Sequence, residues 1–131
     1  FEHPYTIEIP SINVNLPIVP AISKGNDWET TNVGVSYLST SPLPGDQGNS
    51  IFYGHNWEGL LGNLPKVKPG GVIFITMKDG VRKKFIVEYT AVVNPSQTYI
   101  IDSTNDTRIT LYTCTGFLDS KRFVVVAKPH V

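Results

Sequence analysis

The chain has 131 residues, 40% hydrophobic and 17% charged, which is an ordinary composition for a single globular domain spanning residues 1–131. Eleven basic residues balance eleven acidic ones, so no net charge draws the chain to nucleic acid or anionic lipid, and we expect no nucleic-acid partner. The single cysteine excludes an internal disulfide and a zinc site built from several cysteines. No apolar run approaches the roughly 20 residues of a membrane-spanning helix.

The first third of the chain predicts short strands punctuated by proline. Strands are expected at Tyr5–Pro10, Asn13–Val19 and Val33–Leu38. Between the second and third of these, the polar segment Lys24–Thr31 predicts a short helix capped near Asn26 or Asp27. The following segment, Ser39–Gly48, holds two prolines and two glycines and predicts a loop rich in turns.

The middle of the chain predicts strong strands around one interrupted helix. Strands are expected at Asn49–Gly54, Gly71–Met77 and Val81–Val93. Leucines recur at helical spacing in Glu58–Val67, but Gly62 and Pro65 limit this helix to a short or broken one. The Asp79-Gly80 pair after a hydrophobic run predicts a hairpin turn.

The last third predicts two strands, Arg108–Cys114 and Arg122–Lys128, separated by the short connection Thr115–Lys121 and preceded by the polar loop Ser96–Thr107. The whole chain then has seven or eight strands with one or two short helices. Short turns between successive strands favour antiparallel pairing. We expect an all-β protein that closes into a barrel, because closure satisfies the strand edges.

Cys114 lies at the end of its predicted strand. Because side chains alternate along a strand, the aliphatic face would carry Ile109, Leu111 and Thr113, and the more polar face Arg108, Thr110, Tyr112 and Cys114. This position puts the thiol at a rim that a substrate can reach. A lone thiol is nevertheless either an inert small hydrophobe or a reactive group, and its position alone leaves both interpretations open.

His55 and Arg122 are the other candidates. His55 follows a hydrophobic strand and Gly54, where a catalytic group and an ordinary surface histidine are equally plausible. Arg122 opens the strand after Cys114, so an antiparallel pair would make the two residues neighbours. A fixed cation there favours the thiolate and stabilises an oxyanion, although Arg122 taken alone also fits a plain surface residue. Glu58 and Asp119 are near these residues in sequence, but neither is clearly placed to orient the histidine.

Three motifs occur in order: Tyr-Gly-His55-Asn, Thr110-Leu-Tyr-Thr-Cys114, and Arg122-Phe-Val-Val-Val-Ala. Together they resemble the sortases, whose signature is a strand-terminal Gly-His, a Thr-Leu-x-Thr-Cys strand and an arginine opening the last strand. The segment Ile9–Val19 also resembles the opening strands of that family. The resemblance covers the chain from about Ile9 to Val131.

The resemblance implies an eight-stranded β-barrel catalytic domain. It implies that Cys114 is the nucleophile, His55 the general acid and base, and Arg122 the oxyanion-stabilising cation. Thr113 is a substrate contact by its position in the family motif alone. No metal and no cofactor are expected. A class D- or E-like member fits best, because the acidic calcium site, the N-terminal lid motif and the long helical insertion of other classes are not seen in the sequence.

The resemblance also implies partners and a location. The enzyme would act outside the cytoplasm on a bacterial cell surface, tethered by a membrane segment preceding Phe1. Its substrates would be surface proteins with a C-terminal sorting signal similar to Leu-Pro-x-Thr-Gly, read by the Ser96–Thr107 loop and the Thr115–Lys121 connection. The acceptor would be an amine of a peptidoglycan precursor or a pilin lysine. The alternatives are a cysteine peptidase that only hydrolyses, and a non-catalytic β-barrel binding module.

Overall fold

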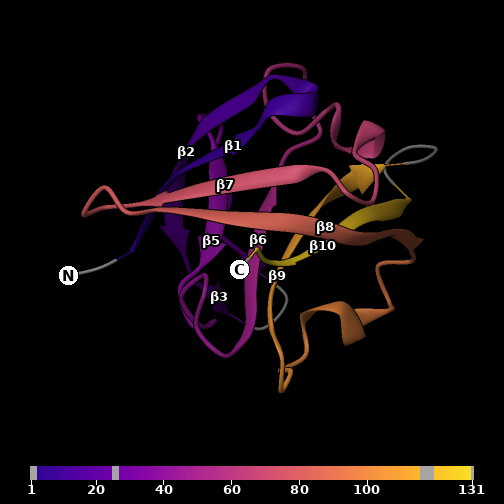
Figure 1. Ribbon diagram of the computed structural model, residues 1–131. Coiled ribbons are helices and arrows are strands. Elements are labelled where there is room, and N and C mark those ends of the chain that lie inside the picture. The colour runs from indigo at the N-terminus through magenta and orange to yellow at the C-terminus, as the bar shows by residue number, and fades with distance from the viewer. Residues whose placement is uncertain (1–2, 25–26, 116–119, 131) are drawn as a thin grey trace.

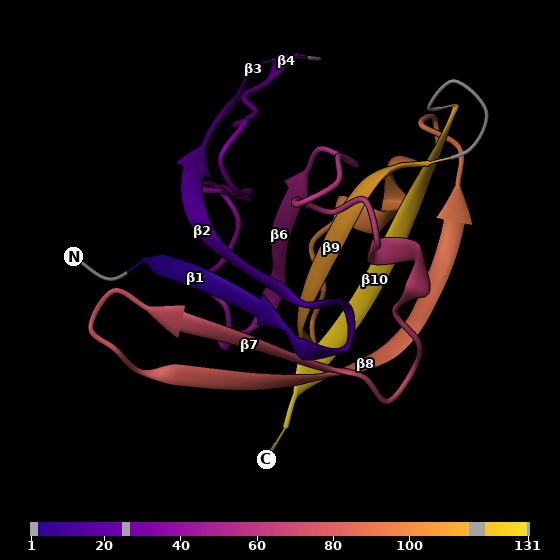
Figure 2. The ribbon, with the colours of Figure 1, turned by 90° about the horizontal axis from the view of Figure 1, so that it is seen from above.

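The computed structural model describes residues 3–24, 27–115 and 120–130, and these form a closed eight-stranded β-barrel (Figure 1). Around the barrel the strands are β1 (Pro4–Ile9), β2 (Val14–Ala21), β5 (Val35–Leu38), β6 (Gly48–Gly54), β9 (Thr107–Thr115), β10 (Lys121–Pro129), β8 (Arg82–Val93) and β7 (Val72–Met77). A separate pair, β3 (Ser23–Lys24) and β4 (Asp27–Trp28), stands beyond the end of β2 (Figure 2). The expected all-β barrel is confirmed.

Two neighbouring pairs in the barrel run parallel, contrary to the antiparallel pairing that the short turns favoured. These are β2 with β5 and β6 with β9. A parallel pair needs a long crossover, and between β6 and β9 the chain supplies one by building the β7–β8 hairpin first. As a consequence, β6 and β9 finish at the same end of the barrel.

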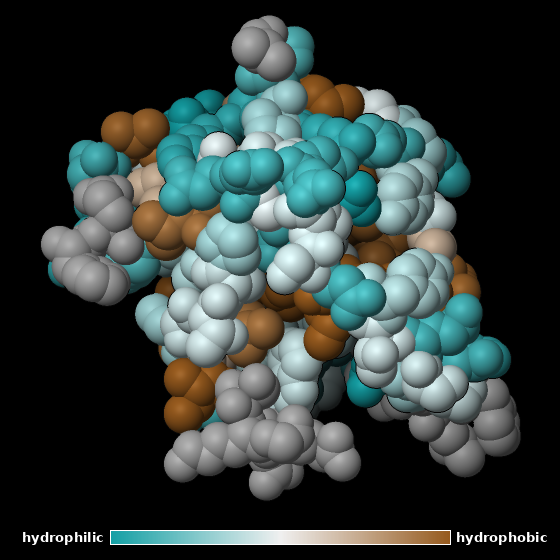
Figure 3. All heavy atoms as spheres, turned by 90° about the horizontal axis from the view of Figure 1, so that it is seen from below, coloured by the Kyte–Doolittle hydropathy of each residue, from teal (hydrophilic) through white to brown (hydrophobic). Residues whose placement is uncertain are grey.

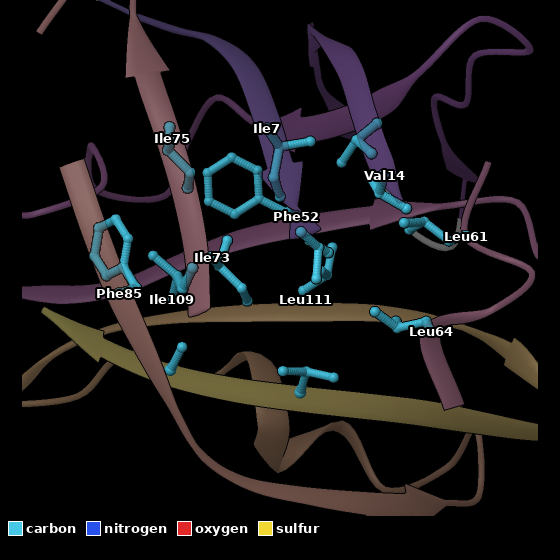
Figure 4. Packing of buried hydrophobic residues seen from close by; sticks show 14 of the residues in the cluster. Ile7, Val14, Phe52, Leu61, Leu64, Ile73, Ile75, Phe85, Ile109 and Leu111 are labelled. Atoms are coloured by element: carbon cyan, nitrogen blue, oxygen red, sulfur yellow. The ribbon is translucent and has the colours of Figure 1, made fainter. Parts of the chain in front are cut away.

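The barrel interior is filled by aliphatic and aromatic side chains from nearly every strand (Figure 4). Its fully buried members include Ile7, Phe52, Leu61, Leu64, Ile73, Ile75, Phe85, Ile109 and Leu111. Strand β7 alternates buried and partly exposed residues, as a strand with one solvent-exposed face does. Strand β6 is buried along both faces, because its outer face is covered as well. That outer cover forms part of the candidate site.

The predicted helix over Lys24–Thr31 is wrong in the residues that are described. Ser23 pairs with Trp28 and Lys24 with Asp27 in a two-stranded sheet, while residues 25–26 lie outside the described ranges. The Glu29 backbone N–H donates to the Ile22 carbonyl at 3.1 Å, which closes this hairpin. A polar capping signal is a weak preference, and the packing of Trp28 against the barrel overrides it.

The helices within the described ranges are all single 3-10 turns: η1 (Pro10–Ile12), η2 (Leu64–Lys66) and η3 (Thr98–Ile101). The expected broken helix over Glu58–Val67 is a run of turns ending in η2, with Pro65 in its first turn.

No helix in the described part of the chain is long and apolar enough to cross a bilayer. Seen from below, hydrophilic residues cover much of the surface, and hydrophobic residues show as scattered groups between them (Figure 3).

Candidate functional site

The register of three adjacent strands brings the sequence-predicted residues to one end of the barrel. In the parallel pair, Gly54 of β6 lies opposite Thr113 of β9. Since these strands run in the same direction, His55 follows Gly54 at the end where Cys114 follows Thr113. In the antiparallel pair of β9 with β10, Cys114 lies opposite Arg122. The side chain of Cys114 lies outside the described part of the structure, so its placement here is that of the backbone.

Thr113 connects the ends of β6 and β9. Its side chain is buried at 2% exposure, and its hydroxyl donates to the Gly54 carbonyl at 2.7 Å. The bond therefore joins the residue before His55 to the residue before Cys114. Thr113 also contributes to the wall of the cavity described next, and its expected contact with a substrate stays a prediction.

A cavity of about 630 Å³ opens at this end of the barrel. Its wall is made by Trp28 and Thr30, by residues 53–57, by seven residues between 93 and 101, and by Tyr112, Thr113 and Arg122. This volume is typical of sites for small molecules or short peptide segments. Among the described residues of the wall, Arg122 carries the only fixed charge. A cation in this wall favours a negatively charged group beside it, so Arg122 is suited to stabilise a thiolate or an oxyanion.

An aromatic cluster supports Arg122. The guanidinium carbon lies 5.9 Å from the centroid of the Tyr112 ring, within the range of a cation–π contact. Tyr112 stacks on Tyr53 with centroids 5.5 Å apart and planes inclined by 16°, and the Trp28 ring meets both edge-on. Burial raises the pKa of Tyr53, and its hydroxyl donates to the Glu29 carbonyl. Arg122 therefore lies against a neutral aromatic surface on the outside of the barrel.

His55 lies against Trp57. The two ring centroids are 4.2 Å apart and the ring planes are inclined by 5°. Both residues contribute to the cavity wall, which holds no acidic side chain among its described residues. Of the two carboxylates near the histidine in sequence, Glu58 is exposed to solvent, and Asp119 lies outside the described residues.

The loop after β8 supplies a second wall of the cavity. It is the expected Ser96–Thr107 loop, and η3 within it places Ile100 and Ile101 at the cavity. The buried side-chain amide of Asn49 donates to the carbonyls of Ile100, at 2.9 Å, and Asp102, at 3.1 Å. The loop is thus attached to β6 of the barrel. The other segment expected to read a substrate, Thr115–Lys121, includes residues 116–119, which lie outside the described ranges.

Sequence reasoning missed the aromatic members of the site. These are Trp28, Tyr53, Trp57 and Tyr112. One signal was available for Tyr112, since strand alternation puts it on the same face as Cys114. A tryptophan in each of two polar segments, at 28 and 57, was a second signal. The described residues hold no group of three or more His, Cys, Asp or Glu that suits a metal ion.

Comparison with known proteins identifies relatives along nearly the whole chain. Residues 7–130 match the family model described as the Sortase domain. Sortase A of Listeria monocytogenes is 31% identical over 127 residues, covering 94% of this chain and 54% of that protein, so the chain spans about half the length of the curated relatives it matches. Among solved structures, a lid mutant of sortase A from Corynebacterium diphtheriae superposes with a TM-score of 0.84 at 32% identity, covering 98% of this chain and 70% of that one. Sortase C-1 from Actinomyces oris superposes with a TM-score of 0.83 at 30% identity, covering 97% of this chain and 71% of that one.

Proposed function

The chain belongs to the sortase family, and we propose that it is a cysteine transpeptidase that cleaves a C-terminal sorting signal through a thioester on Cys114. One observation carries the proposal. The strand register puts Cys114 opposite Arg122, and Gly54, the residue before His55, opposite Thr113, beside a single cavity. A thiol, a general acid and base, and a fixed cation are the groups that acyl transfer from a peptide requires.

In the first half of the reaction, the Cys114 thiolate attacks the carbonyl carbon of the scissile peptide. A carbon–sulfur bond forms, and the carbonyl electron pair moves onto oxygen. The Arg122 guanidinium and backbone N–H groups stabilise that oxyanion. When the tetrahedral intermediate collapses, the carbon–nitrogen bond breaks, and the His55 imidazolium gives its proton to the departing amine. An unprotonated amide nitrogen would be a poor leaving group.

In the second half, an acceptor amine attacks the thioester and neutral His55 takes a proton from it. The new amide forms, the carbon–sulfur bond breaks, and the Cys114 thiolate and the His55 imidazolium are restored.

The acceptor is an amine of a peptidoglycan precursor or a pilin lysine. The reaction takes place outside the cytoplasm, at the bacterial cell surface. A class D- or E-like member of the family stays our prediction for this chain.

The proposed donor is a surface protein ending in a signal similar to Leu-Pro-x-Thr-Gly, cleaved after threonine. The apolar part of the cavity wall supports an uncharged ligand: Val93, Ile100 and Ile101 line the cavity together with the aromatic cluster. Apolar walls with a few placed polar groups are typical of such sites. We propose that Thr113 and the Ser96–Thr107 loop contact the signal.

Mass spectrometry tests the proposal most directly. The protein is mixed with a library of Leu-Pro-x-Thr-Gly-type peptides, with and without triglycine or diaminopimelate, beside a Cys114→Ala control. We expect an acyl adduct on Cys114 that passes to the amine. An adduct that goes only to water would instead identify a hydrolytic peptidase. No adduct with any peptide, together with ordinary thiol reactivity, would leave a non-catalytic binding module.

A further inference from the structure

The imidazole of His55 and the indole of Trp57 form the closest and most nearly parallel pair of rings among the described aromatic contacts. Their centroids are 4.2 Å apart and their planes differ by 5°. A second histidine–aromatic pair, His3 with Tyr5, has centroids 6.5 Å apart and planes inclined by 57°. Trp57 keeps 47% of its surface exposed, so burial in the core does not explain where its ring lies.

The backbone after β6 fixes the position of Trp57. The Leu61 N–H donates to the His55 carbonyl and the Gly62 N–H donates to the Trp57 carbonyl, each at 3.0 Å. Leu61 is fully buried in the barrel core, which anchors this turn. A Cβ on Gly62 would lie 2.9 Å from the carbonyl oxygens of Asn56 and Trp57, so the close return of the chain requires glycine. The turn therefore holds the tryptophan in a set position after the histidine.

We propose that Trp57 is a positioning residue for His55. The indole covers one face of the imidazole and holds the plane of the ring. The contact uses the π face, so both ring nitrogens, which lie in the plane of the imidazole, stay available to the cavity. This inference rests on the proposed function, which assigns to His55 the proton transfers of both half-reactions.

The chemistry explains why such a support is needed. The histidine must deliver a proton to a leaving amine and later remove one from an incoming amine, so its ring has to keep one orientation through two steps. In serine-protease triads a carboxylate holds the histidine. The described wall of this cavity has no carboxylate, and the Trp57 indole is the group that contacts the ring face instead.

The stacking is tested first by NMR of the intact protein, independently of any activity. The chain has three histidines, assigned by single His→Gln variants. We expect ring-current shifts to move the carbon-bound ring protons of His55 upfield, and Trp57→Leu to remove this displacement. Tyr5→Leu, which removes an aromatic side chain of similar exposure (56%), is the matched control and should disturb only His3. His55 signals that do not respond to Trp57→Leu would overturn the inference.

The catalytic consequence is tested with the transpeptidation assay. Misplacement of a catalytic group by about 1 Å costs up to roughly 100-fold, so Trp57→Leu should lower kcat by about 10- to 100-fold while KM stays near that of the wild type. Trp57→Phe keeps an aromatic ring over the histidine and should restore most of kcat. Tyr5→Leu should behave as wild type.

The outcomes separate this inference from the proposed function. If the NMR signature is present and Trp57→Leu keeps full kcat, the positioning role is wrong although the transpeptidase assignment stands. If His55→Ala keeps full kcat, the proposed role of His55 fails and the positioning role fails with it, while NMR still reports the stack. If Trp57→Phe is as impaired as Trp57→Leu in proteins of unchanged circular dichroism, a stacked ring is not what matters, and the inference is overturned.

Discussion

The Thr110 hydroxyl donates a 2.6 Å hydrogen bond to the side-chain oxygen of Asn49, and both residues are buried, at 0% and 4% exposure. They lie on β9 and β6, the parallel pair that ends at the cavity. The amide nitrogen of Asn49 donates to the Ile100 and Asp102 carbonyls, so both of its hydrogens and its oxygen are used. The barrel therefore sets the position of the loop that forms one wall of the cavity.

Asn49→Leu should destabilise the protein and loosen this loop. The substitution leaves two backbone carbonyls and the Thr110 hydroxyl without their partner, which should cost about 2–4 kcal/mol in the free energy of unfolding. Urea unfolding measures the loss, and hydrogen exchange should rise in the 98–102 segment. Gln47→Leu is the control, because that amide donates to Asn105 from an exposed position and its loss should stay within about 0.5 kcal/mol. Equal losses in the two variants would contradict this account of the loop.

Thr113→Val should separate the hydrogen-bonding role of Thr113 from its packing role. The valine keeps the shape but leaves the Gly54 carbonyl without its donor, so the free energy of unfolding should fall by about 1–2 kcal/mol. The rate of acyl-enzyme formation should fall as well, because the ends of β6 and β9 carry His55 and Cys114. Thr113→Ser keeps the hydroxyl and should react faster than the valine variant. The reverse order would show that the methyl group, rather than the hydroxyl, is what this position needs.

Tyr112→Leu should weaken the placement of Arg122. Loss of the ring removes the cation–π contact, worth about 1 kcal/mol, which corresponds to a roughly five-fold fall in kcat. Tyr112→Phe keeps the ring and should retain most of the activity. Arg122→Lys is the reference for losing the guanidinium itself, and we expect it to cost about 100-fold or more. A leucine variant as active as wild type in single-turnover measurements would exclude this support for the arginine.

Asp106 should make the protein less stable in acid. Hydrogen bonds from Arg108, and a further one from Lys128, hold the pKa of this carboxyl well below its ordinary value of 3.8. A carboxyl whose pKa is lowered by folding contributes stability above its unfolded pKa and loses that contribution as the pH falls toward the folded value. The melting temperature of Asp106→Asn should therefore lie below that of the wild type at neutral pH, with the difference shrinking below about pH 4.

Glu8→Gln is the control for this pH dependence. Glu8 pairs with Arg82 through one contact of 2.7 Å between side chains that are 40% and 51% exposed, and such surface pairs contribute little. Its melting temperature should follow the wild type from neutral to acidic pH. Identical pH profiles for Asp106→Asn and the wild type would show that the Asp106 cluster does not stabilise the fold.

The sequence was enough to predict most of the strands and to name candidate site residues. Alternation along Arg108–Cys114 predicted which residues face the core, and Ile109 and Leu111 are indeed fully buried. The three motifs around His55, Cys114 and Arg122 resembled the sortase signature, and the match of residues 7–130 to the Sortase domain confirms that family. The predictions of the strands and of the family succeed because strand period and motif order are local properties of a chain.

The tertiary structure alone decided which strands are neighbours and what covers them. The parallel pairing of β6 with β9 brings the end of β6, before His55, beside the end of β9, and no local pattern in either strand specifies that partner. The same holds for the β3–β4 hairpin, whose Trp28 packs against Tyr53 and Tyr112 from segments distant in sequence. Closing the barrel selects these contacts, because strand edges and apolar faces have to be satisfied together, and a short window of sequence contains only one side of each contact.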